Sequence, residues 1–209
     1  MTQDDLQNDR HRMVRLAMDL IERRGTEVSR VELASAAKIS KSRIDSIFPE
    51  EIDLFDAILE DWYAPDIAIM EEVIESDLPI QRKFFEFFAR RFSREQERFR
   101  KDPDSFALYL ELGTARLEQV RGYIDLADHY MASILAEAME AGYFKGLELD
   151  AIVSLVNTMM QPFCNPSLMM QMMHLATEDR LRAVIDTILE GLHAREGRKT
   201  GKPELYIAK

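Results

Sequence analysis

The sequence predicts an all-α protein of about nine helices, with a small three-helix head followed by a larger helical body. Three observations support this fold class. The 209 residues include only 8 Gly and 7 Pro, too few for a turn-rich all-β architecture. Apolar residues recur at spacings of three and four over long stretches. No alternating apolar pattern is long enough for a β-strand.

Three short helices are expected within the head. The first covers residues 9–24, where apolar side chains recur at helical spacing. The sequence Ser29-Arg30-Val31-Glu32 is a capping-box pattern, in which the Ser hydroxyl and the Glu carboxylate each satisfy an unpaired backbone donor, so a second helix begins there. Ser40 caps a third helix, which ends before Phe48-Pro49.

Longer helices fill the remainder of the chain. Asp77-Leu78-Pro79 and Asp102-Pro103 bracket one of them, because each places a capping acid beside a proline suited to a first helical turn. The others are expected over residues 50–74, 118–141, 150–162 and 177–195. We therefore expect a head over residues 1–50, a ligand-binding and dimerisation body over residues 51–195, and a basic flexible tail over residues 196–209.

Charge is distributed unevenly between these parts. Residues 10–48 carry nine Lys/Arg against five acids, whereas residues 51–209 carry 18 against 29, so the net charge of -11 comes from the body. An acidic body repels phosphate, so a nucleic-acid contact would be confined to the head.

Residues 29–47 have the length and order of a helix-turn-helix, whose second helix enters the major groove of DNA. Small residues allow the two helices to pack closely, and Ile39 fills the turn. Residues 13–59 resemble the N-terminal domain of TetR-type repressors. The resemblance rests on Arg24-Gly25, Glu32-Leu33-Ala34, Ile39-Ser40-Lys41, Phe48-Pro49 and Leu54. Residues 181–192 are similar, more loosely, to the last dimer helix of that family.

The resemblance implies a cytoplasmic homodimeric transcriptional repressor that binds a palindromic DNA operator and is released by a small hydrophobic or aromatic ligand. Its DNA-binding residues in this sequence would be Arg30, Lys38, Ser40, Lys41, Ser42, Arg43 and Ser46. Of these, Arg30 and Lys38 are expected to contact phosphate, and the exposed side of the third helix to face bases or phosphates. Arg10, Arg12 and Arg15 would also reach phosphate, or else be balanced by Asp4, Asp5 and Asp9 on a solvated helix end.

Three residues depart from the family pattern. Asp45 stands where the family usually has a tyrosine that contacts the DNA backbone, and Glu51 stands where it usually has a lysine. A carboxylate about 4–6 Å from a phosphate is repelled by about 1 kcal/mol even with near-aqueous screening. Lys38 replaces the usual glycine of the turn.

These departures leave an alternative function open. The chain would keep the TetR fold, would have lost DNA binding, and would bind a lipid or hydrophobic metabolite, similar to the ubiquinone-biosynthesis accessory proteins of that fold. The basic and aromatic helix over residues 82–101 also fits this alternative, as a membrane-surface helix. The favoured interpretation of that helix is an aromatic stripe facing the core and a solvated face with pairs Glu86–Arg90 and Arg91–Glu95.

The body supplies candidates for two further surfaces. The effector pocket that the resemblance implies would be lined by Phe106, Tyr109, Tyr123, His129 and Tyr130. Residues 151–177 carry no Lys, Arg, Asp or Glu, and repeated polar residues and prolines exclude a membrane span, so a subunit interface is expected. Its residues would be Leu155, Met159, Leu181, Val184, Ile188, Gly191 and Leu192.

The sequence argues against catalysis and against a bound metal or cofactor. Four histidines are scattered, Cys164 has no evident base beside it, and there is no glycine-rich phosphate loop. Asp125 and His129 have the spacing of two metal ligands but lack a third, so a surface hydrogen bond is the expected role. We therefore expect a protein that is not an enzyme.

Overall fold

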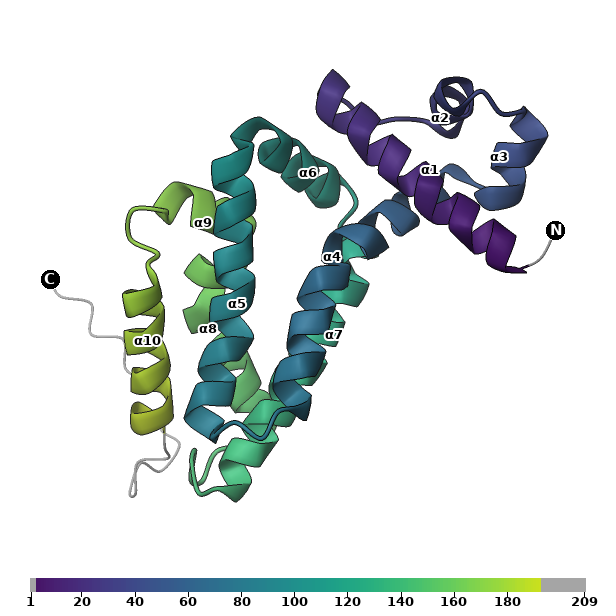
Figure 1. The fold of residues 1–209 in the computed structure, drawn as a ribbon. Helices are drawn as coiled ribbons and strands as arrows, with labels where there is room; N and C mark the ends of the chain where they lie inside the picture. The colour runs from purple at the N-terminus through teal and green to yellow at the C-terminus, as the bar shows by residue number, and fades with distance from the viewer. Residues whose placement is uncertain (1–2, 193–209) are drawn as a thin grey trace, which may run out of the picture.

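The computed structural model describes residues 3–192, which form ten α-helices and no β-strand (Figure 1). The helices are α1 (Gln3–Arg24), α2 (Arg30–Ala37), α3 (Lys41–Ile47), α4 (Glu51–Glu75), α5 (Ile80–Lys101), α6 (Pro103–Ala115), α7 (Leu117–Glu140), α8 (Leu149–Cys164), α9 (Pro166–Met172) and α10 (Glu178–Gly191). The all-α prediction is confirmed, with ten helices instead of about nine. The expected tail over residues 196–209 and the last residues of the expected final helix lie outside the described part of the chain.

Local sequence signals account for the short helices. The Ser29 Oγ accepts the Glu32 N–H at 3.3 Å, and the Glu32 carboxylate accepts the Ser29 N–H at 2.9 Å, so the predicted capping box is present. Ser40 caps α3 by accepting the Arg43 N–H at 3.2 Å. Helix α6 begins in the same way, because the Asp102 carboxylate accepts the Ser105 N–H at 3.0 Å.

The head consists of α1, α2 and α3 around a small apolar core, with Leu33 and Phe48 fully buried at its centre. The body packs α4, α5, α7, α8 and α10 side by side around a larger core that is rich in phenylalanine from α5 (Figure 1). No helix within residues 3–192 is long and apolar enough to cross a membrane.

Helix α4 belongs to both parts. Its first turns contribute Leu54, Ala57 and Ile58 to the head core, while Met70 and Val73 near its other end lie in the body core. The continuous helix therefore joins the two cores, and the head core extends past residue 50.

Helix α6 adds a second connection between head and body. Leu108, Tyr109 and Leu112 pack against the head core, and the Tyr109 hydroxyl lies 3.5 Å from the Met18 carbonyl oxygen of α1. At the corner between α6 and α7, Arg116 pairs with Glu27 of the head. The head is thus held by one shared helix and by one corner of the body.

Candidate nucleic-acid interface

The outer face of α3 carries the polar side chains that the sequence predicts for DNA contact. Lys41, Ser42 and Ser46 are exposed, whereas Ile44 and Ile47 on the opposite face are buried in the head core. The apolar pair positions the helix and leaves its polar face open to solvent. An exposed face of this kind on the second helix of a helix-turn-helix is what entry into a major groove requires.

Two lysines flank this face. Lys38 lies in the turn with φ of 56°, and its N–H donates to the carbonyl oxygens of Ala34 and Ser35, which closes the end of α2. The side chains of Lys38 and Lys41 form no hydrogen bond or ion pair with other residues in the part of the chain that the structure describes. Their ammonium groups are available to a ligand phosphate.

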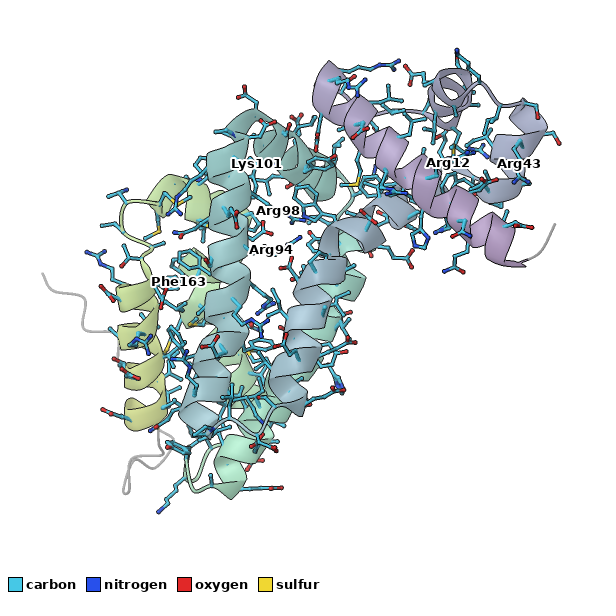
Figure 2. The ribbon with its side chains drawn as sticks, viewed as in Figure 1. Arg12, Arg43, Arg94, Arg98, Lys101 and Phe163 are labelled. Atoms are coloured by element: carbon cyan, nitrogen blue, oxygen red, sulfur yellow. The ribbon has the colours of Figure 1, made fainter. Side chains whose placement is uncertain are left out.

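Arg43 is held differently from the lysines. Its guanidinium pairs with the Asp9 carboxylate of α1, and Arg12 lies 3.2 Å from the other oxygen of the same carboxylate (Figure 2). Asp9 therefore holds together two cations that are expected to reach DNA, Arg12 of α1 and Arg43 of α3. Arg10 lies over the Phe48 ring at 5.2 Å and pairs with Glu60 at 3.5 Å.

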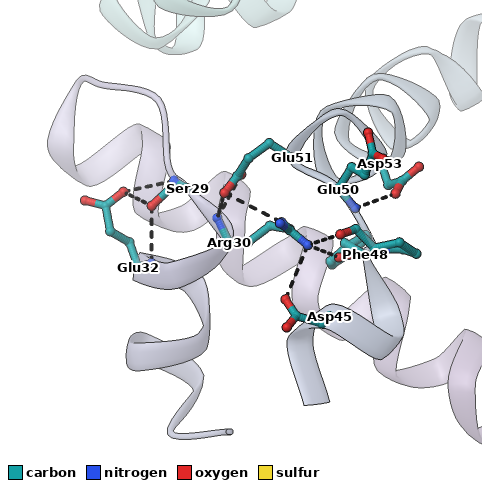
Figure 3. Close-up of polar contacts among 9 residues, drawn as sticks. Ser29, Arg30, Glu32, Asp45, Phe48, Glu50, Glu51 and Asp53 are labelled. Atoms are coloured by element: carbon teal, nitrogen blue, oxygen red, sulfur yellow. Dashed lines mark hydrogen bonds and ion pairs between the residues drawn. The ribbon is translucent and has the colours of Figure 1, made fainter. Parts of the chain in front are cut away.

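Arg30 lies among polar groups of the protein itself (Figure 3). Its Nη1 donates to Asp45 Oδ1 at 3.3 Å, to the Phe48 carbonyl oxygen at 2.6 Å and to the Pro49 carbonyl oxygen. Its Nε lies 3.6 Å from Glu51 Oε1. Asp45 and Glu51, the two carboxylates that depart from the family pattern, are therefore both paired with Arg30. The sequence did not indicate this pairing because the partners are 15 and 21 positions away.

A cavity of about 330 Å³ lies where the head meets the body. Its lining includes Glu27, Glu51, Phe55 and Arg116, and the Arg116 guanidinium lies 4.4 Å from the centre of the Phe55 ring. The head and the α6–α7 corner thus share an ion pair and a cation–π contact.

The five residues expected to line an effector pocket lie in different surroundings, with Phe106, Tyr123 and Tyr130 in or against the body core and Tyr109 against the head core. Tyr109 lies in tilted contact with Trp62, with ring centroids 4.2 Å apart, beside the head. Tyr123 stacks on Tyr63 at 3.8 Å between α4 and α7. Phe106 is buried against Phe99. Tyr130 donates to Glu71 at 3.1 Å, and His129 is exposed.

Helix α5 brings charged side chains into the body interior (Figure 2). Arg94 donates to the buried Asp66 of α4 at 2.8 Å, and Arg98 donates to Glu95 at 2.9 Å and to the Trp62 carbonyl oxygen at 2.9 Å. Burial raises the pKa of Asp66 and of Glu95, although the neighbouring arginines act in the opposite direction. We call these four charged residues the α5 ion cluster.

The α5 ion cluster corrects the expected solvated face of this helix. The Arg94, Glu95 and Arg98 side chains are only 20%, 19% and 22% exposed. Glu86 pairs with Arg82, and Arg90 pairs with Glu72 of α4 at 2.7 Å, so the expected pairs Glu86–Arg90 and Arg91–Glu95 are wrong. Arg90 and Arg94 have carboxylate partners on α4, which the spacing within α5 does not indicate, whereas Glu86 and Glu95 pair with other arginines of α5.

The residues expected at a subunit interface divide into two groups. Leu155 and Met159 of α8 are each 40% exposed, and Gly191 of α10 is also exposed. Leu181 and Ile188 are buried in the core of the same subunit, while Val184 and Leu192 are partly buried against it. The exposed side of α10 includes the small residues Ala183, Thr187 and Gly191.

Comparison with known proteins identifies the fold. PfmR from Thermus thermophilus, a TetR-family regulator, superimposes with a TM-score of 0.51 at 19% identity, over 88% of this chain and 100% of that chain. A putative TetR-family regulator from Mesorhizobium loti gives 0.58 at 15% identity, over 92% and 97%. Thermus thermophilus FadR, a TetR-family repressor solved with lauroyl-CoA, gives 0.57 at 18% identity, over 92% and 99%. No curated protein sequence matches the chain.

The sequence model of the tetracyclin repressor-like C-terminal domain matches residues 81–185, half of the chain. The chain therefore belongs to the tetracyclin repressor-like (TetR) family of transcriptional regulators, as the sequence predicted.

Proposed function

We propose that this protein is a one-component repressor that binds a palindromic operator as a homodimer and releases it when a small hydrophobic or aromatic ligand binds the body. The exposed polar face of α3, opposite the buried Ile44 and Ile47, carries the proposal. Lys41 and Ser42 on that face contact the operator directly. Lys38 contacts phosphate from the turn.

The pairing of Asp45 and Glu51 with Arg30 supports DNA binding over its loss. A carboxylate whose charge is offset by an adjacent guanidinium repels a phosphate less than an isolated one. Arg43 and Ser46 lie on the same helix, so both remain within reach of the groove. To contact DNA, the Arg43 guanidinium must either bind a phosphate while it stays paired with the Asp9 carboxylate, or break that ion pair.

The dimer in this proposal forms through α8 and α10. Leu155 and Met159 supply exposed apolar area, and the small residues Ala183, Thr187 and Gly191 allow a second helix to approach closely. Two-fold symmetry of the protein then matches the symmetry of a palindromic operator.

Ligand release acts through the two connections between body and head. FadR, a relative in fold, was solved with lauroyl-CoA, which supports a ligand with a large apolar part. A ligand that separates α4 from its neighbours would move the shared helix and the α6 corner, including the Trp62–Tyr109 ring contact beside α1. The ligand must favour the released state by a few kcal/mol to empty the operator.

Fluorescence anisotropy tests DNA binding directly. The protein is titrated into the intergenic DNA that flanks its own gene and into a scrambled duplex, at two or more salt concentrations. We expect tighter binding to the native duplex and a steep decrease in affinity with salt. Equal, weak binding to both duplexes, with no tighter site among other genomic fragments, would contradict the proposal and favour the lipid-binding alternative.

A matched pair of variants tests the assigned surface. Lys41→Ala removes one proposed contact, so the slope of log affinity against log salt should fall by about 1. Lys145→Ala removes an equal charge from the exposed loop between α7 and α8 and should leave both affinity and slope unchanged. Equal effects of the two substitutions would contradict the assignment of α3.

A further inference from the structure

The environment of Arg30 differs from that of a DNA contact. Its side chain is only 20% exposed, and its guanidinium is surrounded by Asp45, Glu51 and the carbonyl oxygens of Phe48 and Pro49 (Figure 3). To bind a phosphate through Nη1, Arg30 would have to give up the acceptors that this nitrogen already holds.

These contacts join three helices. Arg30 is the first residue of α2, Asp45 and Phe48 lie at the end of α3, and Glu51 is the first residue of α4. The last carbonyl groups of a helix have no hydrogen-bond donor within the helix and carry its partial negative charge. A cationic side chain placed there supplies both a donor and a compensating positive charge. Arg30 supplies that cation to α3.

The link between α2 and α4 runs in both directions. The Arg30 backbone N–H, one of the unpaired donors at the start of α2, donates to the two Glu51 carboxylate oxygens at 3.1 and 3.0 Å. Glu51 of α4 therefore caps the start of α2, while the Arg30 side chain donates to the Phe48 carbonyl oxygen at the end of α3. We call Arg30, Asp45 and Glu51 the head brace.

We propose that Arg30 is a positioning residue, which sets the angle of α3 against α2 and α4 through the head brace and does not itself contact DNA. Asp45 and Glu51 are then its structural counter-charges. The proposal rests on the proposed function for its effect on operator affinity, but its effect on the head does not depend on DNA.

The test uses full-length Arg30→Gln and Arg30→Lys variants, with Lys41→Ala as a control. Lysine keeps the charge but lacks the planar fork that reaches several acceptors, so a positioning role predicts that both Arg30 variants lose operator affinity by about tenfold. Because no phosphate contact is lost, the salt slope should stay at the parent value. A slope lowered by about 1 in Arg30→Gln but retained in Arg30→Lys would overturn the proposal.

Hydrogen exchange in the absence of DNA provides the second readout. We expect faster exchange of the backbone amides of Ile44 and Phe48, which bond within α3, in both Arg30 variants, and parent rates in Lys41→Ala. If Arg30→Gln unfolds the whole head, Arg30→Lys decides: unchanged exchange in α3 overturns the proposal. A parent protein that binds no duplex would contradict the proposed function, and the exchange result would still decide the role of Arg30.

Discussion

The head brace and the α5 ion cluster are built from the same chemistry in different surroundings. In the head brace the Asp45 and Glu51 side chains are 41% and 53% exposed, whereas the Asp66 side chain beside Arg94 is 3% exposed. Water screens the two carboxylates of the head brace and barely reaches Asp66. We infer that Arg30 mainly fixes geometry, and that Arg94 mainly compensates a charge that is costly to bury.

The largest expected effect follows from breaking the buried pair. Arg94→Ala leaves the Asp66 carboxylate without its cation in the interior, so the free energy of unfolding should fall by about 3 kcal/mol. Chemical denaturation measures the change. Arg90→Ala, which removes a cation from the exposed Glu72, is the control and should cost far less. Equal losses in the two variants would mean that burial of Asp66 does not make its ion pair more costly to break than the exposed pair of Glu72.

A smaller effect is expected from the head brace. The double-mutant cycle of Arg30→Gln and Asp45→Asn should give a coupling energy of about 0.5–1 kcal/mol, because the pair lies 3.3 Å apart but is partly solvated. Denaturation of the parent, both single variants and the double variant supplies the four values. Additive losses would mean that Asp45 is not a partner of Arg30 in solution.

The dependence of stability on pH should have opposite signs at two carboxyl groups. Burial raises the pKa of Asp66 in the fold, so the folded protein holds this proton more tightly than the unfolded chain, and stability from this group falls as pH rises through the raised pKa. The unfolding free energy of the parent minus that of Asp66→Asn should therefore increase as the pH is lowered from 7 towards the ordinary carboxyl pKa of about 4.

Glu72 supplies the control for this sign. Its hydrogen bond with Arg90 lowers its pKa, so its stabilising contribution is present above the ordinary carboxyl pKa and is lost as the pH falls through the lowered value. The parent minus Glu72→Gln difference should shrink as the solution is acidified. Denaturation midpoints across the pH series measure both differences, and the same sign at both sites would contradict the predicted effect of burial.

The smallest effect on stability is expected at the α3 surface. Lys41→Ala removes an exposed side chain without partners among residues 3–192, so the free energy of unfolding should change by less than about 0.5 kcal/mol while operator affinity falls. Measuring both quantities on one preparation separates a binding residue from a structural one. A large loss of stability would instead mean that Lys41, like Arg30, has a structural role.

Sequence patterns predicted the features that depend on near neighbours. The capping box of Ser29 and Glu32 spans three positions, and Ser40 reaches Arg43 over the same distance, so both were visible in the sequence. Asp45 as the partner of Arg30 and Asp66 as the partner of Arg94 were not visible, because they lie 15 and 28 positions away and meet only after the helices pack. Without these partners in view, the sequence presents Asp45 and Glu51 as isolated anions.

The continuity of α4 has a consequence for protein engineering. A residue inserted between Ile58 and Met70 would rotate the two ends of the helix by about 100° relative to each other and lengthen it by about 1.5 Å. The residues of α4 that pack in the head core and those that pack in the body core could then no longer face their own cores at the same time. Chimaeras that exchange heads between related regulators should therefore keep the length of α4 constant and cross over after Ile58, because a junction at residue 50 divides the head core.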